Sequence, residues 1–134
     1  MRLKYVGTVL AIAIFVLSLL SGCGAKDPLA GTEWVLVDLG DRLPQEGTSV
    51  TLAFKDGQAY GSAGCNSYGG EYTLKGDEIS FGAMASTLMA CSDEGVMEQE
   101  TLYLQRLAQV FTYSLENGML VLYLSDGSLM SFSQ

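Results

Sequence analysis

The sequence contains no histidine among its 134 residues. Histidine is the commonest catalytic base and a principal zinc ligand, so its absence excludes Ser-His-Asp sites, Cys-His sites and histidine-based metal sites. Two carboxylates could still support hydrolysis. The candidate pairs, Asp77 with Glu78 and Glu98 with Glu100, fall at a predicted turn and on a predicted helix surface, where solvated charge is the ordinary role. We therefore predict that the protein is not an enzyme and uses no cofactor.

Basic residues are also scarce. The chain has 7 Lys and Arg against 15 Asp and Glu, which gives a net charge of −8. This sign argues against partners such as nucleic acid and against electrostatic docking on anionic lipid. The neighbouring acids Asp93, Glu94, Glu98 and Glu100 could hold calcium, but they lack the alternating spacing and the glycine of an EF-hand loop. No bound metal is expected.

Glycine, in contrast, is common, and five glycines gather in the middle of the chain: Gly57, Gly61, Gly64, Gly69 and Gly70. They could suggest a phosphate-binding loop. No Gly-Lys-Ser/Thr follows them, however, and no helix start is indicated nearby. Turns, bulges and close approach of neighbouring strands explain them better.

Long apolar runs are absent except at the start of the chain. Arg2 and Lys4 precede residues 9–20, which contain one polar side chain, Ser18, and no charge. This pattern is typical of a secretory signal peptide. The alternative is a membrane-spanning helix, which needs about 20 apolar residues. Residues 5–20 supply 16, and the small pair Ser21-Gly22 suits a peptidase site better than a helix end.

The segment Leu20-Ser21-Gly22-Cys23 resembles the lipobox of a bacterial lipoprotein precursor. The resemblance implies that residues 1–22 are a lipoprotein signal peptide, that the Cys23 thiol carries a diacylglyceryl group, and that its new amino end is acylated, for example with palmitate. Residues 23–30 would form a lipidated tether and residues 31–134 the domain. Loss of Arg2 and Lys4 would leave five basic and 15 acidic residues, a net charge of −10.

These features predict a location in the cell envelope, with the domain facing outside the cytoplasm and attached to the membrane through the lipid on Cys23. Two or three acyl chains are enough for stable anchoring. Gly24 stands where an aspartate often retains lipoproteins at the inner membrane. We therefore expect the outer membrane in a two-membrane bacterium, and otherwise the outer face of the cell membrane.

Only three cysteines are present, and lipidation of Cys23 leaves Cys65 and Cys91 as an even pair. An extracytoplasmic compartment permits disulfides, so a bridge between these two is our working prediction. Two buried free cysteines, packed as small apolar groups, are the alternative.

Turn signals dominate the second half of the sequence, each between segments rich in β-forming residues. Tight turns with positive φ favour Asp-Gly and Asn-Gly, and such pairs at this spacing predict successive hairpins. A first strand is expected at 33–39. The predicted hairpins join 50–54 to 59–64 at Asp56-Gly57, 71–74 to 78–81 at Gly76-Asp77, 111–115 to 120–124 at Asn117-Gly118, and 120–124 to 128–132 at Asp126-Gly127.

One helical window, residues 94–110, interrupts this series. Its apolar residues Met97, Leu104, Leu107 and Phe111 fall near helical spacing, and Ser92 or Asp93 is placed to cap the first turn. The fold class predicted is mainly β (α+β). We expect an antiparallel meander that forms a strongly bent sheet or partly open barrel, with one helix packed across an end or a gap.

Five ordered landmarks resemble the META domain family (HslJ-like), whose match covers about residues 30–133. They are Gly31-Thr32-Glu33-Trp34, the triplet Gly64-Cys65-Asn66 followed by Gly70-Glu71-Tyr72, the segment Thr87-Leu88-Met89-Ala90-Cys91, Glu98 with residues 104–107, and Leu120-Val121-Leu122. The resemblance implies a small β-rich fold, common on bacterial lipoproteins and secreted proteins, and no known enzymatic reaction. The family has been linked to stress response, motility and secretion.

Within this motif, Gly64, Asn66 and Tyr72 are the candidate surface residues. Asn66 can satisfy loop backbone groups or adopt positive φ while Cys65 pairs with or packs near Cys91, and the same loop could form part of a partner or ligand surface. Our leading hypothesis is a membrane-anchored, non-catalytic lipoprotein that supports envelope integrity or stress response by contacting an unidentified envelope protein. The alternative is a small carrier or sensor of an apolar ligand such as an acyl chain, with Met84, Met89 and Met97 as an adaptable lining of the barrel interior.

Overall fold

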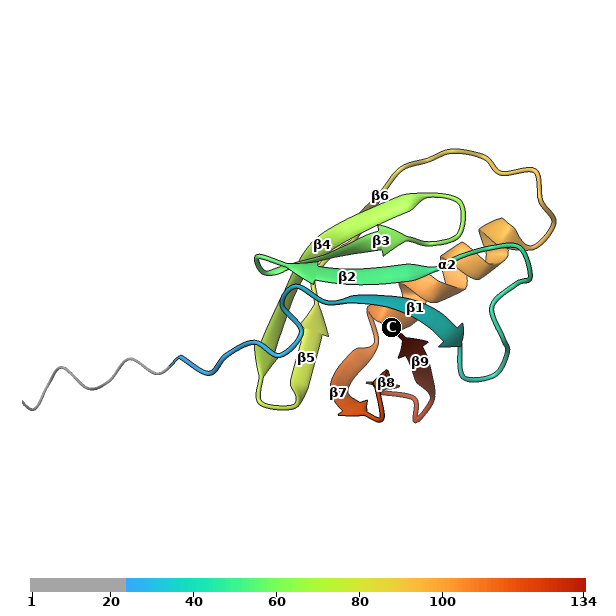
Figure 1. Ribbon diagram of the computed structural model, residues 1–134. Helices are drawn as coiled ribbons and strands as arrows, with labels where there is room; N and C mark the ends of the chain where they lie inside the picture. Colours follow the sequence, from blue (N-terminus) through green and yellow to red (C-terminus); the bar gives the residue numbers. More distant parts are fainter. Residues whose placement is uncertain (1–23) are drawn as a thin grey trace, which may run out of the picture.

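The computed structural model describes residues 24–134, and the predicted signal peptide (1–22) and Cys23 lie outside them. The described part contains a run of strands and one helix (Figure 1). In chain order these are β1 (Glu33–Asp38), β2 (Thr51–Lys55), β3 (Gln58–Ser62), β4 (Ser67–Lys75), β5 (Glu78–Phe81), β6 (Ala85–Ser86), α2 (Val96–Leu107), β7 (Val110–Glu116), β8 (Met119–Leu124) and β9 (Leu129–Ser133).

The four predicted hairpins are confirmed. Each predicted turn joins two strands that pair antiparallel: β2 with β3, β4 with β5, β7 with β8, and β8 with β9. Asp56 and Asn117 both have positive φ, 52° and 51°, and each is followed by a glycine with positive φ. Tight hairpin turns of this kind need left-handed residues in succession, which is why Asp-Gly and Asn-Gly mark them.

Eight strands close into an antiparallel barrel. Neighbours in sequence are neighbours in the sheet, β3 pairs with β4, and β9 returns to pair with β1. The short strand β6 adds to β4 at Ser86 opposite Tyr68. The predicted mainly β meander with one packed helix is therefore confirmed, and pairing of the first strand with the last closes it.

The weakest seam of the barrel lies between β5 and β7. These strands share a single register pair, Glu78 with Thr112. The carbonyl of Asp77 accepts hydrogen bonds from the Tyr113 amide (3.0 Å) and the Thr112 hydroxyl (2.7 Å). Beyond this point the two strands diverge, and a bulge at the start of β7 leaves Phe111 half exposed.

Apolar side chains fill the inside of the barrel. Strands β8 and β9 alternate strictly, with every second residue buried, as expected where one face of a sheet lies against a core. The Phe54 ring packs edge-on against Tyr72, with centroids 4.9 Å apart. The buried core includes Trp34, Leu36, Leu52, Phe54, Tyr68, Tyr72, Ile79, Tyr103, Leu107, Leu120, Leu122, Leu124, Met130 and Phe132.

Helix α2 lies across one end of the barrel. Tyr103 and Leu107 are fully buried, and the Tyr103 ring packs edge-on against Tyr68 and Phe132. The hydroxyl groups of Tyr103 and Tyr68 are 2.6 Å apart, and the Tyr68 hydroxyl also donates to the Thr51 carbonyl (2.7 Å). The helix thus contributes Tyr103 and Leu107 to the core.

The predicted cap of this helix is wrong. The residue before the first turn is Gly95, with φ of 81°, and no side chain caps the helix. Ser92 and Asp93 lie further back in the exposed loop. A left-handed residue turns the chain into the helix here, and an added Cβ on Gly95 would come within 2.9 Å of the Gln45 side chain.

The predicted apolar face of the helix is also wrong in part. Met97 is exposed (38%), Leu104 is half buried, and Phe111 belongs to β7. Leu107 lies on the buried side as predicted, and Leu104 packs against the edge of the core. The side of the helix that packs on the barrel includes two polar side chains, so it differs from the side predicted from apolar residues alone. Its buried residues are Val96, Gln99, Glu100, Tyr103 and Leu107.

Residues just before β1 pack against the barrel. Leu29 is fully buried, and Asp27 accepts hydrogen bonds from the amides of Leu29 (2.8 Å) and Ala30 (3.1 Å) and from the Tyr72 hydroxyl. The boundary predicted at residue 31 falls inside this contact, which leaves only residues 24–26 of the described tether outside it. Within residues 24–134, no helix has the length and apolar character needed to cross a membrane.

Candidate functional site

The Gly64-Cys65-Asn66 motif forms the connection between β3 and β4, and it is bound to the segment that follows β6. The side-chain oxygen of Asn66 accepts hydrogen bonds from the Thr87 hydroxyl (2.8 Å) and the Met89 amide (2.7 Å). Its side-chain nitrogen donates to the Met89 carbonyl (3.1 Å). Asn66 has no positive φ, so its role here is to satisfy backbone groups of a second loop.

Glu100 on helix α2 completes this network of hydrogen bonds around Asn66. One carboxylate oxygen accepts a hydrogen bond from the Asn66 backbone amide and the other from the Asn66 side-chain nitrogen, both at 2.7 Å. Glu100 is only 5% exposed and Asn66 only 1%. A buried carboxylate is costly unless it is hydrogen-bonded, and two amide donors meet that need.

Sequence reasoning placed Glu100 on a solvated helix surface, which the structure contradicts. Glu98, its proposed partner in a carboxylate pair, has a side chain that is 76% exposed. One signal could have found Glu100: it falls between Val96 and Tyr103 on the stripe that ends at Leu107. A polar residue inside an apolar stripe is a candidate for a buried hydrogen bond.

Gln99 holds a third segment to the same end of the barrel. Its side-chain oxygen accepts from the Gln45 amide (2.5 Å), and its nitrogen donates to the Thr48 hydroxyl (3.0 Å). The same nitrogen would lie 3.3 Å from a Cβ added to Gly64, whose φ is 114°. A glycine is therefore required at position 64, because the backbone there is left-handed and packs closely on the helix.

Cys65 and Cys91 are joined by a disulfide, with Cα atoms 6.1 Å apart. The bond ties the end of the 87–91 segment to the β3–β4 connection, next to Asn66. Thr87 is held at the other end, because its amide donates to the Ser67 carbonyl (3.0 Å). The whole segment is thus fastened at both ends and in its middle.

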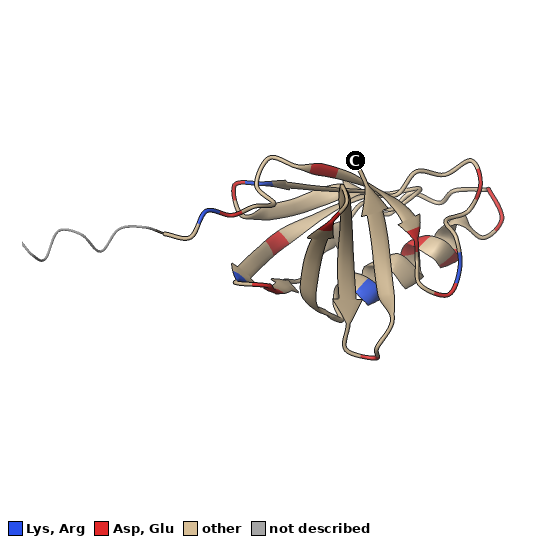
Figure 2. Cartoon of the chain, turned by 60° about the horizontal axis from the view of Figure 1, so that its bottom comes forward, with Lys and Arg blue, Asp and Glu red and all other residues tan. Residues whose placement is uncertain are grey.

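This fastened segment presents apolar side chains to solvent. Leu88 is 95% exposed and Met89 57% exposed, and Met97 of α2 faces them across a hollow of about 470 Å³. We call this the loop–helix surface. It is lined by Asn66, Ser86, Leu88, Met89, Ala90, Met97, Glu100, Thr101, Leu104 and Gln105. Figure 2 shows acidic positions on α2 and on the adjoining loops.

Tyr72, the third candidate surface residue, does not contact the Gly64-Cys65-Asn66 connection. Its ring is buried against Phe54, and its hydroxyl donates to Asp27 near the N-terminal segment. Burial, together with the hydrogen bond to Asp27, raises the pKa of Tyr72. Gly64 and Asn66 therefore lie together in the β3–β4 connection, where Asn66 is buried and not exposed as predicted, whereas Tyr72 belongs to the core and to the attachment of residues 27–30.

The remaining sequence candidates do not form a chemical centre in the described residues. Glu78 pairs across the hairpin with Lys75 in backbone register, and Asp77 lies in the turn between them. No group of three or more acidic or cysteine side chains in residues 24–134 is placed to hold a metal ion. Gly57 has positive φ in its turn, and an added Cβ on Gly61 or Gly70 would collide with a neighbouring backbone carbonyl.

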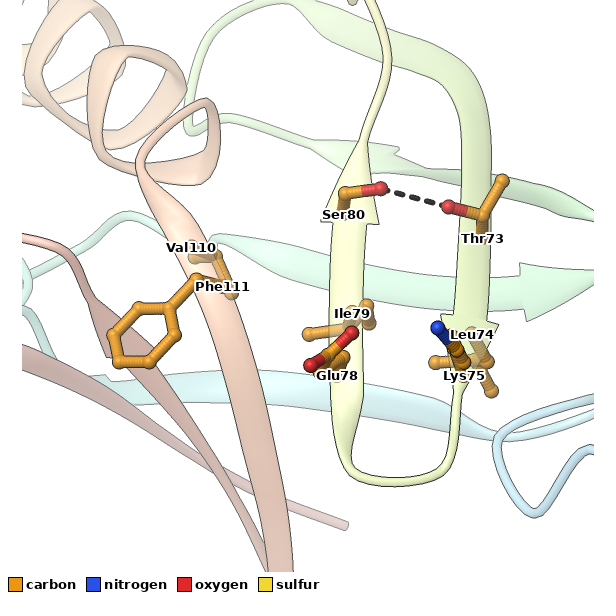
Figure 3. A pocket seen from close by; sticks show the side chains of 8 residues that line it. All are labelled: Thr73, Leu74, Lys75, Glu78, Ile79, Ser80, Val110 and Phe111. Carbon is orange, nitrogen blue, oxygen red and sulfur yellow. Dashed lines mark hydrogen bonds between the residues drawn. The ribbon is translucent and has the colours of Figure 1, made fainter.

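A second hollow, of about 480 Å³, follows the β5–β7 seam on the outside of the barrel. Figure 3 shows Phe111 beside it, with the Thr73 and Ser80 hydroxyl groups hydrogen-bonded to each other (2.7 Å) across β4 and β5. Ile79 faces the core instead. The hollow is lined by the oppositely charged side chains of Lys75 and Glu78 and by apolar side chains, and no convergent set of reactive groups lies in it.

The methionines predicted to line an interior chamber lie elsewhere. Met89 and Met97 are exposed on the loop–helix surface, and Met84 packs from the side onto the filled core. The hollows described above open to the outside of the barrel.

Comparison with solved structures finds the same fold. An NMR structure of a protein from Burkholderia xenovorans is 29% identical, with a TM-score of 0.67, over 84% of this chain and 93% of that one. A second NMR structure is 20% identical, with a TM-score of 0.64, over 78% and 90%. A crystal structure of a DUF4847 family protein from Bacteroides vulgatus is 16% identical, with a TM-score of 0.54, over 82% and 96%.

No match is found among curated proteins. The family profile described as "META domain" matches residues 27–134, which is the barrel together with the residues that pack in front of β1. The ordered landmarks, the closed barrel and this match agree. The chain belongs to the META domain family.

Proposed function

We propose that the protein is a lipoprotein of the cell envelope, anchored through Cys23, that carries out no catalysis and supports envelope integrity or stress response by contacting another protein. The anchoring rests on the basic start, the apolar run and Leu20-Ser21-Gly22-Cys23. The contact role rests on the loop–helix surface.

The observation that carries the contact role is the exposure of Leu88. A leucine gains about 1.5–3 kcal/mol when its side chain is buried, so a free apolar loop tends to fold back on the protein. Here Asn66 binds both Thr87 and Met89, and Leu88 between them is held 95% exposed. Exposed apolar side chains on a fixed loop are typical of a binding surface.

The position of the surface agrees with an anchor at the N-terminus. The segment 24–26 lies beside the β2–β3 and β4–β5 turns, because Ala25 and Lys26 share a hollow with Gly57 and Gly76. The loop–helix surface lies at the opposite end of the barrel (Figure 1). A domain held by Cys23 would therefore turn Leu88 away from the membrane, where a partner can reach it.

The buried polar groups support a non-catalytic role. Both oxygens of Glu100 are occupied by Asn66, and the Tyr68 and Tyr103 hydroxyl groups bind each other. In the described part of the chain, no buried side-chain nitrogen or oxygen lacks a hydrogen-bond partner. Groups that are fully satisfied within the fold stabilise it, which is the ordinary role of buried polar side chains.

Lipid analysis of the full-length protein purified from membranes distinguishes the contact role from the alternative, a carrier of an apolar ligand. Native mass spectrometry in a mild detergent reports any lipid bound without a covalent link. We expect the protein with its covalent lipid alone. One non-covalent lipid per chain, retained through exchange of the detergent, would contradict the contact role and favour the carrier.

A further inference from the structure

We propose that the loop–helix surface docks a segment of a partner protein in which a Lys or Arg is flanked by apolar side chains. This rests on the proposed function and adds the chemistry of the partner. The apolar side chains would pack on Leu88, Met89 and Met97, and the cation would lie toward the exposed carboxylates of Asp93, Glu94 and Glu98.

The apolar half of the site comes from two elements that face each other. Leu88 and Met89 lie on the fastened loop, and Met97 and Leu104 lie about two turns apart on the same side of α2. Methionine side chains are flexible and polarizable, so they adapt to a partner of irregular shape. The hollow between the two elements is large enough to accept one or two side chains.

The charge of the site selects the sign of the partner. Residues 87–105, which comprise the fastened loop and most of α2, contain four acidic residues and no Lys or Arg. Asp93 and Glu94 are exposed in the segment between Ala90 and Met97, which both line the hollow, and the exposed Glu98 follows Met97. Glu100 also lines the hollow. An acidic rim favours and steers a basic segment, whereas an acidic segment would be repelled.

Glu98 gives the strongest reason for a cation in the partner, because its side chain is 76% exposed next to Met97 on α2. Glu100, in contrast, is only 5% exposed, and both of its carboxylate oxygens accept hydrogen bonds from Asn66, so it belongs to the fold and not to the partner's site. Arg42 reaches Glu98 at 3.5 Å, but both side chains are more than half exposed, so that pair is weak. A partner's Lys or Arg can extend its apolar stem over Met97 and bring its charge to the Glu98 carboxylate.

The test is site-specific photo-cross-linking of the full-length, lipidated protein in its own cells. A benzophenone amino acid is placed at position 88 or 97, and the matched control carries it at position 111, an equally apolar and half-exposed site on β7. Substitution at these exposed positions leaves the core untouched. Mass spectrometry then identifies the partner residues joined to each position.

We expect positions 88 and 97 to join one partner segment with Lys or Arg beside apolar residues, and position 111 to give no such product. Glu98→Gln should lower the yield at position 88 several-fold, and added salt should lower it further. An acidic or uncharged segment, a second copy of this chain, cross-links to lipid alone, or no product above that at position 111 would each overturn the proposal. Cross-linking from position 111 to a different protein would overturn this site while leaving the contact role in place.

Discussion

At the residue scale, two buried polar side chains organise the most specific part of the fold. Asn66 joins the β3–β4 connection to the 87–91 segment, and Glu100 holds Asn66 in place from α2. The motif resemblance pointed to Asn66, Cys65 and Cys91. It gave no indication of Glu100, because contact between residues 34 positions apart depends on the packing of the helix on the barrel.

Replacing Asn66 tests this network. Asn66→Ala removes four side-chain hydrogen bonds and leaves Glu100 with one donor, so we expect a loss of roughly 2–4 kcal/mol in the free energy of unfolding. Urea denaturation followed by circular dichroism measures it. Gln105→Ala, an exposed change on the same helix, is the control and should change little. Equal stability of the two variants would contradict the role of Asn66.

The Tyr68–Tyr103 pair gives a prediction about pH. Burial raises the pKa of both hydroxyl groups above the ordinary value of 10.0. The stability contributed by keeping them neutral is complete below pH 10 and falls as the pH rises above it, because the unfolded chain then releases protons that the folded chain retains.

Absorbance at 295 nm and circular dichroism, followed together from pH 9 to 13, measure this effect. We expect the ionisation of Tyr68 and Tyr103 to coincide with unfolding. A chain whose tyrosines all ionise reversibly near pH 10, with its circular dichroism unchanged, would contradict the burial of the pair.

At the scale of elements, hairpins were predictable and the helix was not fully so. A hairpin is specified locally, by Asp56-Gly57 or Asn117-Gly118 between alternating residues, and the sequence carries that signal in full. The face and cap of α2 depend on distant partners: Gln99 turns inward because the Gln45 amide donates to its side chain and the Thr48 hydroxyl accepts from it. Closure of the barrel by β9 on β1 likewise joins the two ends of the domain, which no local pattern specifies.

Close approach of β2 and β3 predicts a sharp difference between two glycines. A Cβ on Gly61 would collide with the Thr51 carbonyl, which also accepts from Tyr68, whereas a Cβ on Gly69 would meet Tyr60 at 3.4 Å. Gly61→Ala should therefore lower the free energy of unfolding by about 1–3 kcal/mol, as overpacking typically does. Thermal unfolding compares the two, and a Gly69→Ala variant less stable than Gly61→Ala would count against this packing.

The disulfide predicts a change in both stability and loop motion. Its two cysteines are 26 positions apart, so the double variant Cys65→Ser, Cys91→Ser should lose about 3–4 kcal/mol in the chain-entropy view. Hydrogen exchange should rise at residues 87–91 and stay slow in β8. Unchanged exchange in that segment would show that Asn66 alone holds it.

At the scale of the whole molecule, the two ends of the barrel have different roles. One end receives the N-terminal segment, where Asp27 binds Tyr72 and Leu29 is buried. The other end carries the loop–helix surface. The family landmarks predicted from the sequence extend over both ends, and the family match from residue 27 covers them together. The proposed anchor would set the direction in which that surface faces.

The most direct measurement is mass spectrometry of the N-terminal peptide of the protein purified from the membranes of its own cells. Tryptic cleavage after Lys26 releases this peptide. We predict that it begins at Cys23, lacks residues 1–22, and carries a diacylglyceryl group on the thiol together with an acyl chain on the amino group. A peptide that begins elsewhere, or an unmodified Cys23, would contradict the account of an envelope-anchored protein.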